Sequence, residues 1–224
     1  MENDVQQAPP RRRYDTTRRK AAAAQNRHAI AAAARQIFLE RGYTATTVAA
    51  IAEAAGVAHE TIYATFGSKA ALFRHLVEIA LSGAEEPIPA LERDIVRQVQ
   101  AEADPEKILD LFAHTVRLLQ ERLAPLFEVL SNAAWNEPEL KAFADELGTR
   151  RVGHMRVFVS DLASKGGLRD GLSVEMAADI VWVMNSAEFY LLCARDRGWT
   201  PAYFERWLAD TWKRLLLPGR PQMH

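Results

Sequence analysis

Apolar residues recur along this chain with the three- and four-residue spacing of an α-helix. The first clear stripe consists of Ile30, Ala33, Ala34, Ile37 and Phe38. Alanine, the best helix former, fills 15 of the 35 positions from 21 to 55. The pattern therefore predicts a helix that starts near Thr17 and ends at Gly42.

The same period continues through the rest of the sequence. It predicts short helices that begin after Thr46 or Thr47 and near Ala58, and a longer helix between Ser68 and Gly83. Further helices are expected from residue 104, over 124–135 and 137–164, from 173 to about 195, and from 200 onward. Because no strand-like alternation is sustained, the sequence predicts an all-α fold of about nine helices.

Charge divides the chain into a basic and an acidic part. The 224 residues carry 28 Lys and Arg against 29 Asp and Glu, a net charge of −1. Residues 1–80 hold 11 of the basic and 7 of the acidic groups, whereas residues 81–224 hold 17 and 22. A basic N-terminal part is typical of a protein that binds a polyanion. Residues 1–17, which include three consecutive arginines and no apolar period, are expected to form a flexible basic arm.

No segment is expected to export or anchor the protein. The first twenty residues are polar and basic, without the apolar core of a signal peptide. The most apolar stretch, 176–194, contains Asp179, Asn185 and Glu188, which are costly at membrane depth. We therefore expect a cytoplasmic protein without membrane contact.

Residues 46–72 have the spacing of a helix-turn-helix, with short helices on either side of a tight turn at Gly56. Ile62 and Phe66 are four residues apart and face inward. This leaves a mostly polar set toward solvent: Ala58, His59, Glu60, Thr61, Tyr63 and Thr65. Imidazole, hydroxyl and phenol groups on such a helix can hydrogen-bond base edges and phosphates.

This segment resembles the DNA-binding signature of the TetR family of bacterial transcriptional regulators. The residues that carry the resemblance are Thr47, Ile51, Ala52, Ala55, Gly56, Val57, Thr61, Ile62, Tyr63, Phe66, Ser68, Lys69 and Leu72, after a helix that ends in Phe38, Gly42, Tyr43 and Thr44. The resemblance implies a helix-turn-helix DNA-binding domain over residues 18–83 and an effector-binding and dimerisation domain over 84–217. It also implies a homodimer, most simply a repressor, that binds a palindromic operator in double-stranded DNA and is released by a small-molecule effector. The helix over 68–82 would transmit the change.

The same resemblance implies which residues contact DNA. Thr47, Thr61, Tyr63 and Lys69 match phosphate-contacting positions, and His59 and Thr65 lie where bases or nearby phosphates are contacted. Glu60 departs from the usual small or basic residue, since phosphates repel a carboxylate unless it accepts from a cytosine amine. For the arm, entry into a minor groove and a solvated tail remain open alternatives.

A second class of function is a small-molecule-binding helical protein, or an enzyme, whose basic part contacts RNA or only packs. The six histidines include no pair with metal-ligand spacing, and the glycines at 166, 167 and 171 lack the strand-turn-helix setting of a nucleotide loop. Tyr63 is the sole aromatic residue expected on the exposed face, so the stacking platform of a single-strand RNA binder is missing. We therefore expect no enzyme activity, no cofactor and no metal.

Polar or aromatic residues on otherwise apolar helix faces are the candidates for an effector pocket, although each is alternatively a core or interface residue. They are His114, Trp135, Phe158, Trp182, Asn185 and Glu188. Asn185 and Glu188 are three residues apart and share a helix face, where they either meet a ligand or hydrogen-bond across a dimer interface. The set predicts an aromatic, mostly apolar pocket with few polar anchors.

The last two long helices carry more apolar surface than one chain is expected to bury. Two helices from each subunit would form a four-helix interface around a twofold axis. The residues assigned to this interface are Tyr190, Trp207, Leu208 and Trp212.

Overall fold

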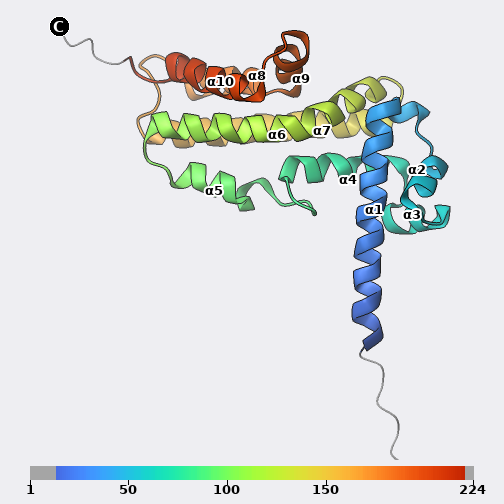
Figure 1. Ribbon diagram of the computed structural model, residues 1–224. Helices are drawn as coiled ribbons and strands as arrows, with labels where there is room; N and C mark the ends of the chain where they lie inside the picture. Colours follow the sequence, from blue (N-terminus) through green and yellow to red (C-terminus); the bar gives the residue numbers. More distant parts are fainter. Residues whose placement is uncertain (1–13, 220–224) are drawn as a thin grey trace, which may run out of the picture.

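The computed structural model describes residues 14–219, and within them the fold is all α-helical, as predicted. It contains ten α-helices, one short 3-10 helix (η1) and one π-helical turn (η2) in that range (Figure 1). Their bounds are α1 Tyr14–Ala45, α2 Val48–Ala55, α3 His59–Phe66, α4 Lys69–Ser82, η1 Ala90–Glu92, α5 Asp94–Ala101, α6 Pro105–Ala134, α7 Pro138–Ser164, α8 Val174–Met184, α9 Ala187–Leu191, η2 Leu192–Asp196 and α10 Pro201–Leu216.

Two long helices, α6 and α7, form the centre of the molecule. In Figure 1, α8, α9 and α10 lie on one side of this pair, and α4 and α5 lie on the other. Helix α1 packs across α6 and carries α2 and α3 beside it, while its N-terminal half extends away from the body. None of the helices in the described range is long and apolar enough to cross a membrane.

Several helix boundaries differ from the sequence prediction. Helix α1 already begins at Tyr14, so the predicted arm over 1–17 is not wholly separate from the helix, and its residues 1–13 lie outside the described residues. Helix α6 runs unbroken through Pro125, although a proline has no amide hydrogen and cannot donate the backbone hydrogen bond of its position. The long helix expected over 173–195 instead ends at Met184, because the Ser186 hydroxyl accepts from the amide of Phe189 and starts a new helix.

The buried side chains form two cores that share helices α6 and α7. The first core joins α1 to α4 with the C-terminal part of α6 and the start of α7, including Leu126, Leu130 and Phe143. The second core fills the space between α5, the rest of α6 and α7, and α8 to α10. Since α6 and α7 contribute to both cores, a shift of either helix changes the packing in both halves of the molecule.

Candidate functional site

The predicted helix-turn-helix is present, and its first helix is capped at both ends. The Thr47 hydroxyl accepts a hydrogen bond from the amide of Ala50 at 3.1 Å and so caps the start of α2. Gly56 ends α2 with a φ of 65°, a left-handed conformation that glycine adopts without strain. Ile51 of α2 and Ile62 of α3 are fully buried in the first core. The turn and this packing fix the orientation of α3.

Helix α3 presents a polar, partly aromatic face to solvent. His59 and Glu60 in its first turn are exposed, and Tyr63, one turn later, is 46% exposed. The rings of His59 and Tyr63 meet edge to face, with centroids 5.0 Å apart. Thr61 and Thr65 are half-buried, and the Thr65 hydroxyl donates to the Thr61 carbonyl at 2.6 Å. Four of the residues predicted to contact DNA therefore share this helix, with the Thr65 hydroxyl engaged by the backbone.

Lys69, predicted to hold a phosphate, binds the backbone of its own chain in this structure. Its ammonium group donates to the carbonyls of Tyr43 and Thr46, both at 3.1 Å, and lies 4.0 Å from the centre of the Tyr43 ring. Burial lowers the pKa of Lys69, while the charge of Glu137 raises it. The side chain thus ties the start of α4 to the end of α1 and to the segment before α2. One of its three N–H groups remains for another partner.

Comparison with known proteins identifies this helix-turn-helix. The family model described as "Bacterial regulatory proteins, tetR family" matches residues 30–76, which run from α1 into α4. The HTH-type transcriptional repressor BepR of Brucella suis biovar 1 is 31% identical over 171 residues, which cover 70% of this chain and 75% of BepR. The chain belongs to the TetR family. It is a transcriptional regulator of that family.

The likeness of this TetR-family regulator to other proteins extends beyond the DNA-binding helices. An uncharacterized HTH-type transcriptional regulator of Bacillus subtilis, YdeS, is 29% identical over 161 residues, 69% of this chain and 73% of YdeS. Among solved structures, that of NalD, the secondary repressor of the MexAB-OprM multidrug efflux pump in Pseudomonas aeruginosa, matches with a TM-score of 0.67 at 23% identity. That match covers 88% of this chain and 98% of NalD, so it includes the C-terminal helices. The relatives named here are regulators rather than enzymes.

The C-terminal part of the TetR-family regulator contains a cavity of about 470 Å³. Its walls come mainly from α5, α6 and α7, with further residues from α4, η1, α8 and α9. Phe112 of α6 and Phe158 of α7 stack in the wall, with ring centroids 3.8 Å apart. A mostly apolar cavity of this size is suited to a small organic molecule.

Four of the six residues predicted to bind the effector line this cavity: Phe158, Trp182, Asn185 and Glu188. Trp135 does not, because it ends α6 where the chain turns toward α7 and its side chain is 87% exposed. His114 does not line the cavity either. Within residues 14–219, no group of three or more His, Cys, Asp or Glu side chains is arranged to hold a metal ion.

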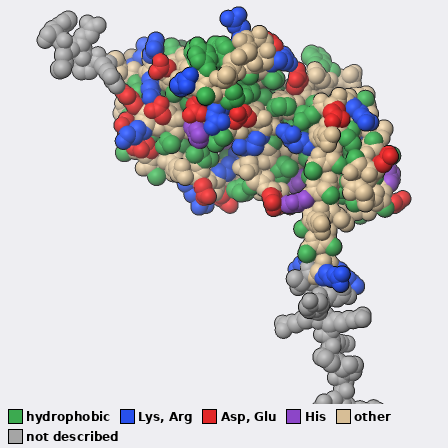
Figure 2. Space-filling model, viewed as in Figure 1, with side chains coloured by type: hydrophobic (Ala, Val, Ile, Leu, Met, Phe, Trp, Pro, Cys, Tyr) green, Lys and Arg blue, Asp and Glu red, His purple; other side chains and the backbone are tan. Residues whose placement is uncertain are grey.

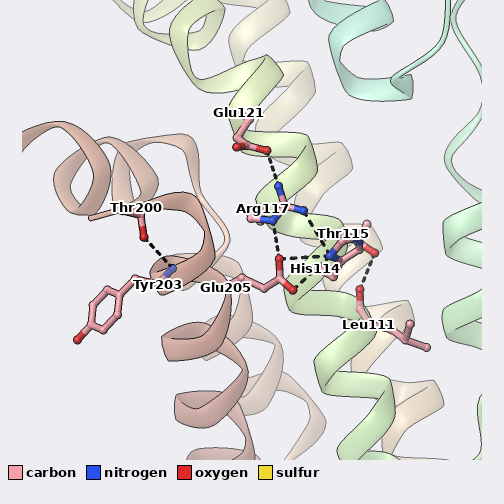
Figure 3. A network of polar contacts seen from close by, with 8 residues as sticks. All are labelled: Leu111, His114, Thr115, Arg117, Glu121, Thr200, Tyr203 and Glu205. Carbon is pink, nitrogen blue, oxygen red and sulfur yellow. Dashed lines mark hydrogen bonds and ion pairs between the residues drawn. The ribbon is translucent and has the colours of Figure 1, made fainter. Parts of the chain in front are cut away.

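His114 belongs to a polar network that joins α6 to α10 (Figure 3). Its Nδ1 lies 3.2 Å from each carboxylate oxygen of Glu205, and Arg117 donates to the same carboxylate and to Glu121. Hydrogen bonding to Glu205 raises the pKa of Arg117. These contacts account for a polar residue at position 114 without a ligand. The prediction that His114 lines the effector pocket is therefore corrected.

Asn185 lies at the break between α8 and α9 and is 6% exposed. Its carbonyl accepts from Nε2 of Gln120 at 2.6 Å, its Oδ1 accepts from Arg151 at 3.3 Å, and its Nδ2 contacts the sulfur of Met155 at 2.8 Å. Asn185 is therefore held within one chain and beside the cavity rather than at an outer surface. Glu188, which follows the break, is exposed and also lines the cavity. Of the two alternatives raised by the sequence, this arrangement favours the pocket.

Arginines in the cavity wall were not predicted from the sequence: Arg93, Arg150 and Arg151. Arg150 donates to both carboxylate oxygens of Glu78 on α4, at 2.6 and 3.2 Å. The guanidinium of Arg151 lies 4.4 Å from the ring centre of Trp182 and donates to the Trp182 carbonyl at 3.2 Å. The sequence signal that could have indicated these arginines is the adjacent pair Arg150 and Arg151 in the middle of a helix. Neighbouring side chains diverge by about 100° around a helix, so one of two adjacent residues lies closer to the side of the helix that faces the protein interior.

Most residues predicted for the dimer interface lie inside the chain. Leu208 and Trp212 are fully buried, Tyr190 is 8% exposed and Trp207 is half-buried. The Trp212 ring packs against that of Phe112, with centroids 5.3 Å apart. The apolar stripe of α10 therefore completes the core of its own chain, which corrects the prediction for Leu208 and Trp212. The large apolar side chains that are exposed between α8 and α10 are Met176, Val183, Leu192, Tyr203 and Leu215.

Proposed function

We propose that this protein binds an operator in double-stranded DNA as a homodimer, acts as a repressor, and leaves the operator when a small molecule occupies the cavity. In this proposal residues 18–83 bind DNA and residues 84–217 bind the effector and dimerise. The observation that carries it is the exposed polar face of α3 on a capped, well-packed helix-turn-helix. Membership of the TetR family supports it.

On DNA, α3 would lie in the major groove with His59 toward base edges and Tyr63 toward a phosphate. Thr47 sits at the N-terminus of α2, where the free amides and the helix dipole favour an anion. Two copies of α3 around a twofold axis would reach successive major grooves about 34–36 Å apart. The exposed Arg18, Arg19 and Lys20 add positive charge at the end of α1 that stands clear of the body (Figure 2).

Helix α4 is the element through which the cavity would act on α3. It follows α3 directly, and ion pairs from Arg74 to Glu146 and from Glu78 to Arg150 join it to α7. Near its end, the carbonyl of Ala80 accepts from the guanidinium of Arg122 on α6 at 3.2 Å. A shift of α6 or α7 on effector binding therefore moves α4 and changes the separation of the two α3 helices.

For the dimer, the exposed apolar side chains of α8 to α10 provide the contact surface. Val183 of α8 and Leu192 in the turn after α9 are 52% and 56% exposed, and Tyr203 of α10 is 45% exposed. Several large apolar groups on neighbouring elements are typical of an interaction surface. A twofold axis through this surface would bring the same helices of both subunits together.

The DNA-binding proposal is tested by selecting duplexes from a random pool with the full chain and measuring affinity by fluorescence anisotropy. His59→Ala is expected to weaken binding to the selected site by about 1–3 kcal/mol while leaving non-specific binding nearly unchanged. His114→Ala, on α6, is the matched control and is expected to bind like the parent. Failure to enrich any sequence would contradict the proposal, and an equal loss on all sequences would move His59 from base to backbone contact.

A further inference from the structure

The charged groups of the cavity wall are partnered to different degrees. Asp161 pairs with Lys165 at 2.8 Å, and Arg150 pairs with Glu78. Arg93 has no such partner among the described side chains: its Nε donates to the carbonyl of Ile88 at 3.1 Å, and none of their ion pairs includes it. A half-buried guanidinium without a counter-ion is costly in a mostly apolar wall. Arg93 therefore marks a position that favours a negative charge.

Other positive groups surround Arg93. Burial lowers the pKa of Arg93, and the charges of Arg150 and Arg122 lower it further, with only Glu78 acting in the opposite direction. Burial and the charges of Arg150 and Arg93 likewise lower the pKa of His154, which also lines the cavity. These side chains lie close enough to repel one another, and the two carboxylates that pair with the cluster, Glu78 and Glu146, both pair with Arg150.

A cationic ligand has a poorer site in the same cavity. Positively charged organic groups are commonly held against the face of an aromatic ring, and Trp182 is the tryptophan of this wall. The guanidinium of Arg151 already lies against that ring at 4.4 Å from its centre. Glu188 is exposed and acts electrostatically on Arg151, whose pKa it raises against the lowering by burial. The aromatic face and the nearby carboxylate are thus both used by the protein's own cation.

The remainder of the wall is suited to an apolar body. Phe112 and Phe158 are stacked, and Val116, Leu119 and Leu123 of α6 contribute further carbon surface. Arg93 lies at the N-terminus of α5, and the stacked rings belong to α6 and α7. A ligand that contacts both Arg93 and the stacked rings therefore spans the cavity. Such a ligand has one charged end and one apolar end.

We propose that the cavity binds an amphipathic anion, with a carboxylate or sulfonate head paired to Arg93 and an apolar body against Phe112 and Phe158. This inference rests on the proposed function and specifies the chemical class of its effector. The head group would supply the counter-ion that Arg93 lacks, and the body would bury apolar surface within the second core.

A pair of fluorescent dyes that share one aromatic body tests the charge preference directly. Anilinonaphthalene sulfonate carries the anionic group, and phenylnaphthylamine is the same molecule without it. Titrated against the full chain, the sulfonate is expected to bind at least about tenfold more tightly, the effect of one charge-assisted hydrogen-bonded pair. Arg93→Met and Arg93→Gln are expected to remove this preference, and Arg93→Lys to retain most of it.

Two further variants locate the binding. Arg97→Met, one turn along α5 at an exposed position outside the cavity wall, is the matched control and is expected to keep the preference. Gly148 lines the cavity, and a Cβ added there meets no atom within 4 Å, so Gly148→Phe can fill the space and is expected to abolish binding of both dyes. Circular dichroism verifies that each variant is folded.

Three results would overturn the assignment of ligand class. They are equal or tighter binding of the neutral dye, a sulfonate preference that survives both charge-removing changes at Arg93, and dye binding that survives Gly148→Phe. A parallel anisotropy assay with operator DNA keeps the two proposals apart. Arg93-dependent dye binding that leaves DNA affinity unchanged would support the ligand class and contradict effector-driven release. If only the neutral dye released the protein from DNA, effector-driven release would be supported and the anionic ligand class contradicted.

Discussion

Replacement of Lys69 by methionine separates two roles for this side chain, support of the helix-turn-helix and contact with DNA phosphate. Methionine keeps most of the apolar stem and removes the ammonium group, which donates to the carbonyls of Tyr43 and Thr46 and lies over the Tyr43 ring. Each hydrogen bond from a charged donor contributes about 1.5–3 kcal/mol, and a partly exposed cation–π contact about 0.5–1 kcal/mol. Because Lys69 is only half-buried, interactions with water offset part of the lost interaction energy. The free energy of unfolding is expected to fall by about 2–3 kcal/mol.

Thermal unfolding of the full chain provides the first measurement. A loss of this size corresponds to a fall in melting temperature of about 5–10 °C for a chain of this length. Lys141→Met is the matched control, since Lys141 is exposed on α7 and pairs with Asp145 one turn away. Such a surface pair contributes about 0.3–0.5 kcal/mol. If Lys69→Met is no more destabilising than Lys141→Met, the structural role assigned to Lys69 is refuted.

The salt dependence of DNA binding provides the second measurement. A lysine that neutralises one phosphate contributes about 0.9 to the slope of log affinity against log salt concentration. The structural role predicts weaker DNA binding for Lys69→Met with an unchanged slope, because the orientation of α2 and α4 is loosened and no phosphate contact is lost. A slope that becomes shallower by about one unit, with unfolding unaffected, would instead make Lys69 a phosphate ligand.

Three further predictions concern stability, pH and assembly. Thr46→Val removes a buried hydroxyl that donates to the Gly42 carbonyl at 2.6 Å, so urea unfolding is expected to show a loss of about 1–3 kcal/mol, with Thr46→Ser nearer the parent. Burial lowers the pKa of His75 below its ordinary 6.5. The unfolded chain therefore takes up this proton first as the pH falls through about 6.5, and stability drops from pH 7 toward 5, less steeply in His75→Gln. Leu192→Glu is expected to convert a dimer to monomers in sedimentation velocity while Trp135→Glu does not; a Leu192→Glu protein that stays dimeric would exclude this surface.

Local sequence patterns predict the DNA-binding helices well. A cap at Thr47, a turn at Gly56 and apolar residues at Ile51 and Ile62 lie within a few residues of one another, so their joint meaning is readable without the rest of the chain. What the pattern did not reveal is that the Lys69 side chain reaches back to the end of α1. That contact spans 26 residues of sequence and depends on the angle between helices.

The cavity depends on contacts between distant parts of the chain, and its residues were predicted less completely. Phe158 and Trp182 could be recognised in the sequence as aromatic residues on apolar helix faces. Arg93, in contrast, resembles an ordinary surface charge beside a short helix. Periodicity also cannot distinguish an apolar stripe that packs within the chain from one that packs on a partner. For this reason Trp212 was assigned to an interface although it contacts Phe112 of the same chain.

Arg150 connects the cavity to α4, the helix that follows the helix-turn-helix. It lines the cavity, and it donates to both carboxylate oxygens of Glu78 on α4. A ligand shifts a conformational equilibrium only if its affinity for the two states differs. In our proposal an anionic head group beside Arg93 competes with Glu78 for Arg150, so it binds more tightly to the state in which that ion pair is broken. Glu78, half-buried beside α7 without this partner, would then favour displacement of α4 toward solvent. Because only two residues separate the end of α3 from the start of α4, the proposal links the loss of the Arg150–Glu78 ion pair to a movement of α3.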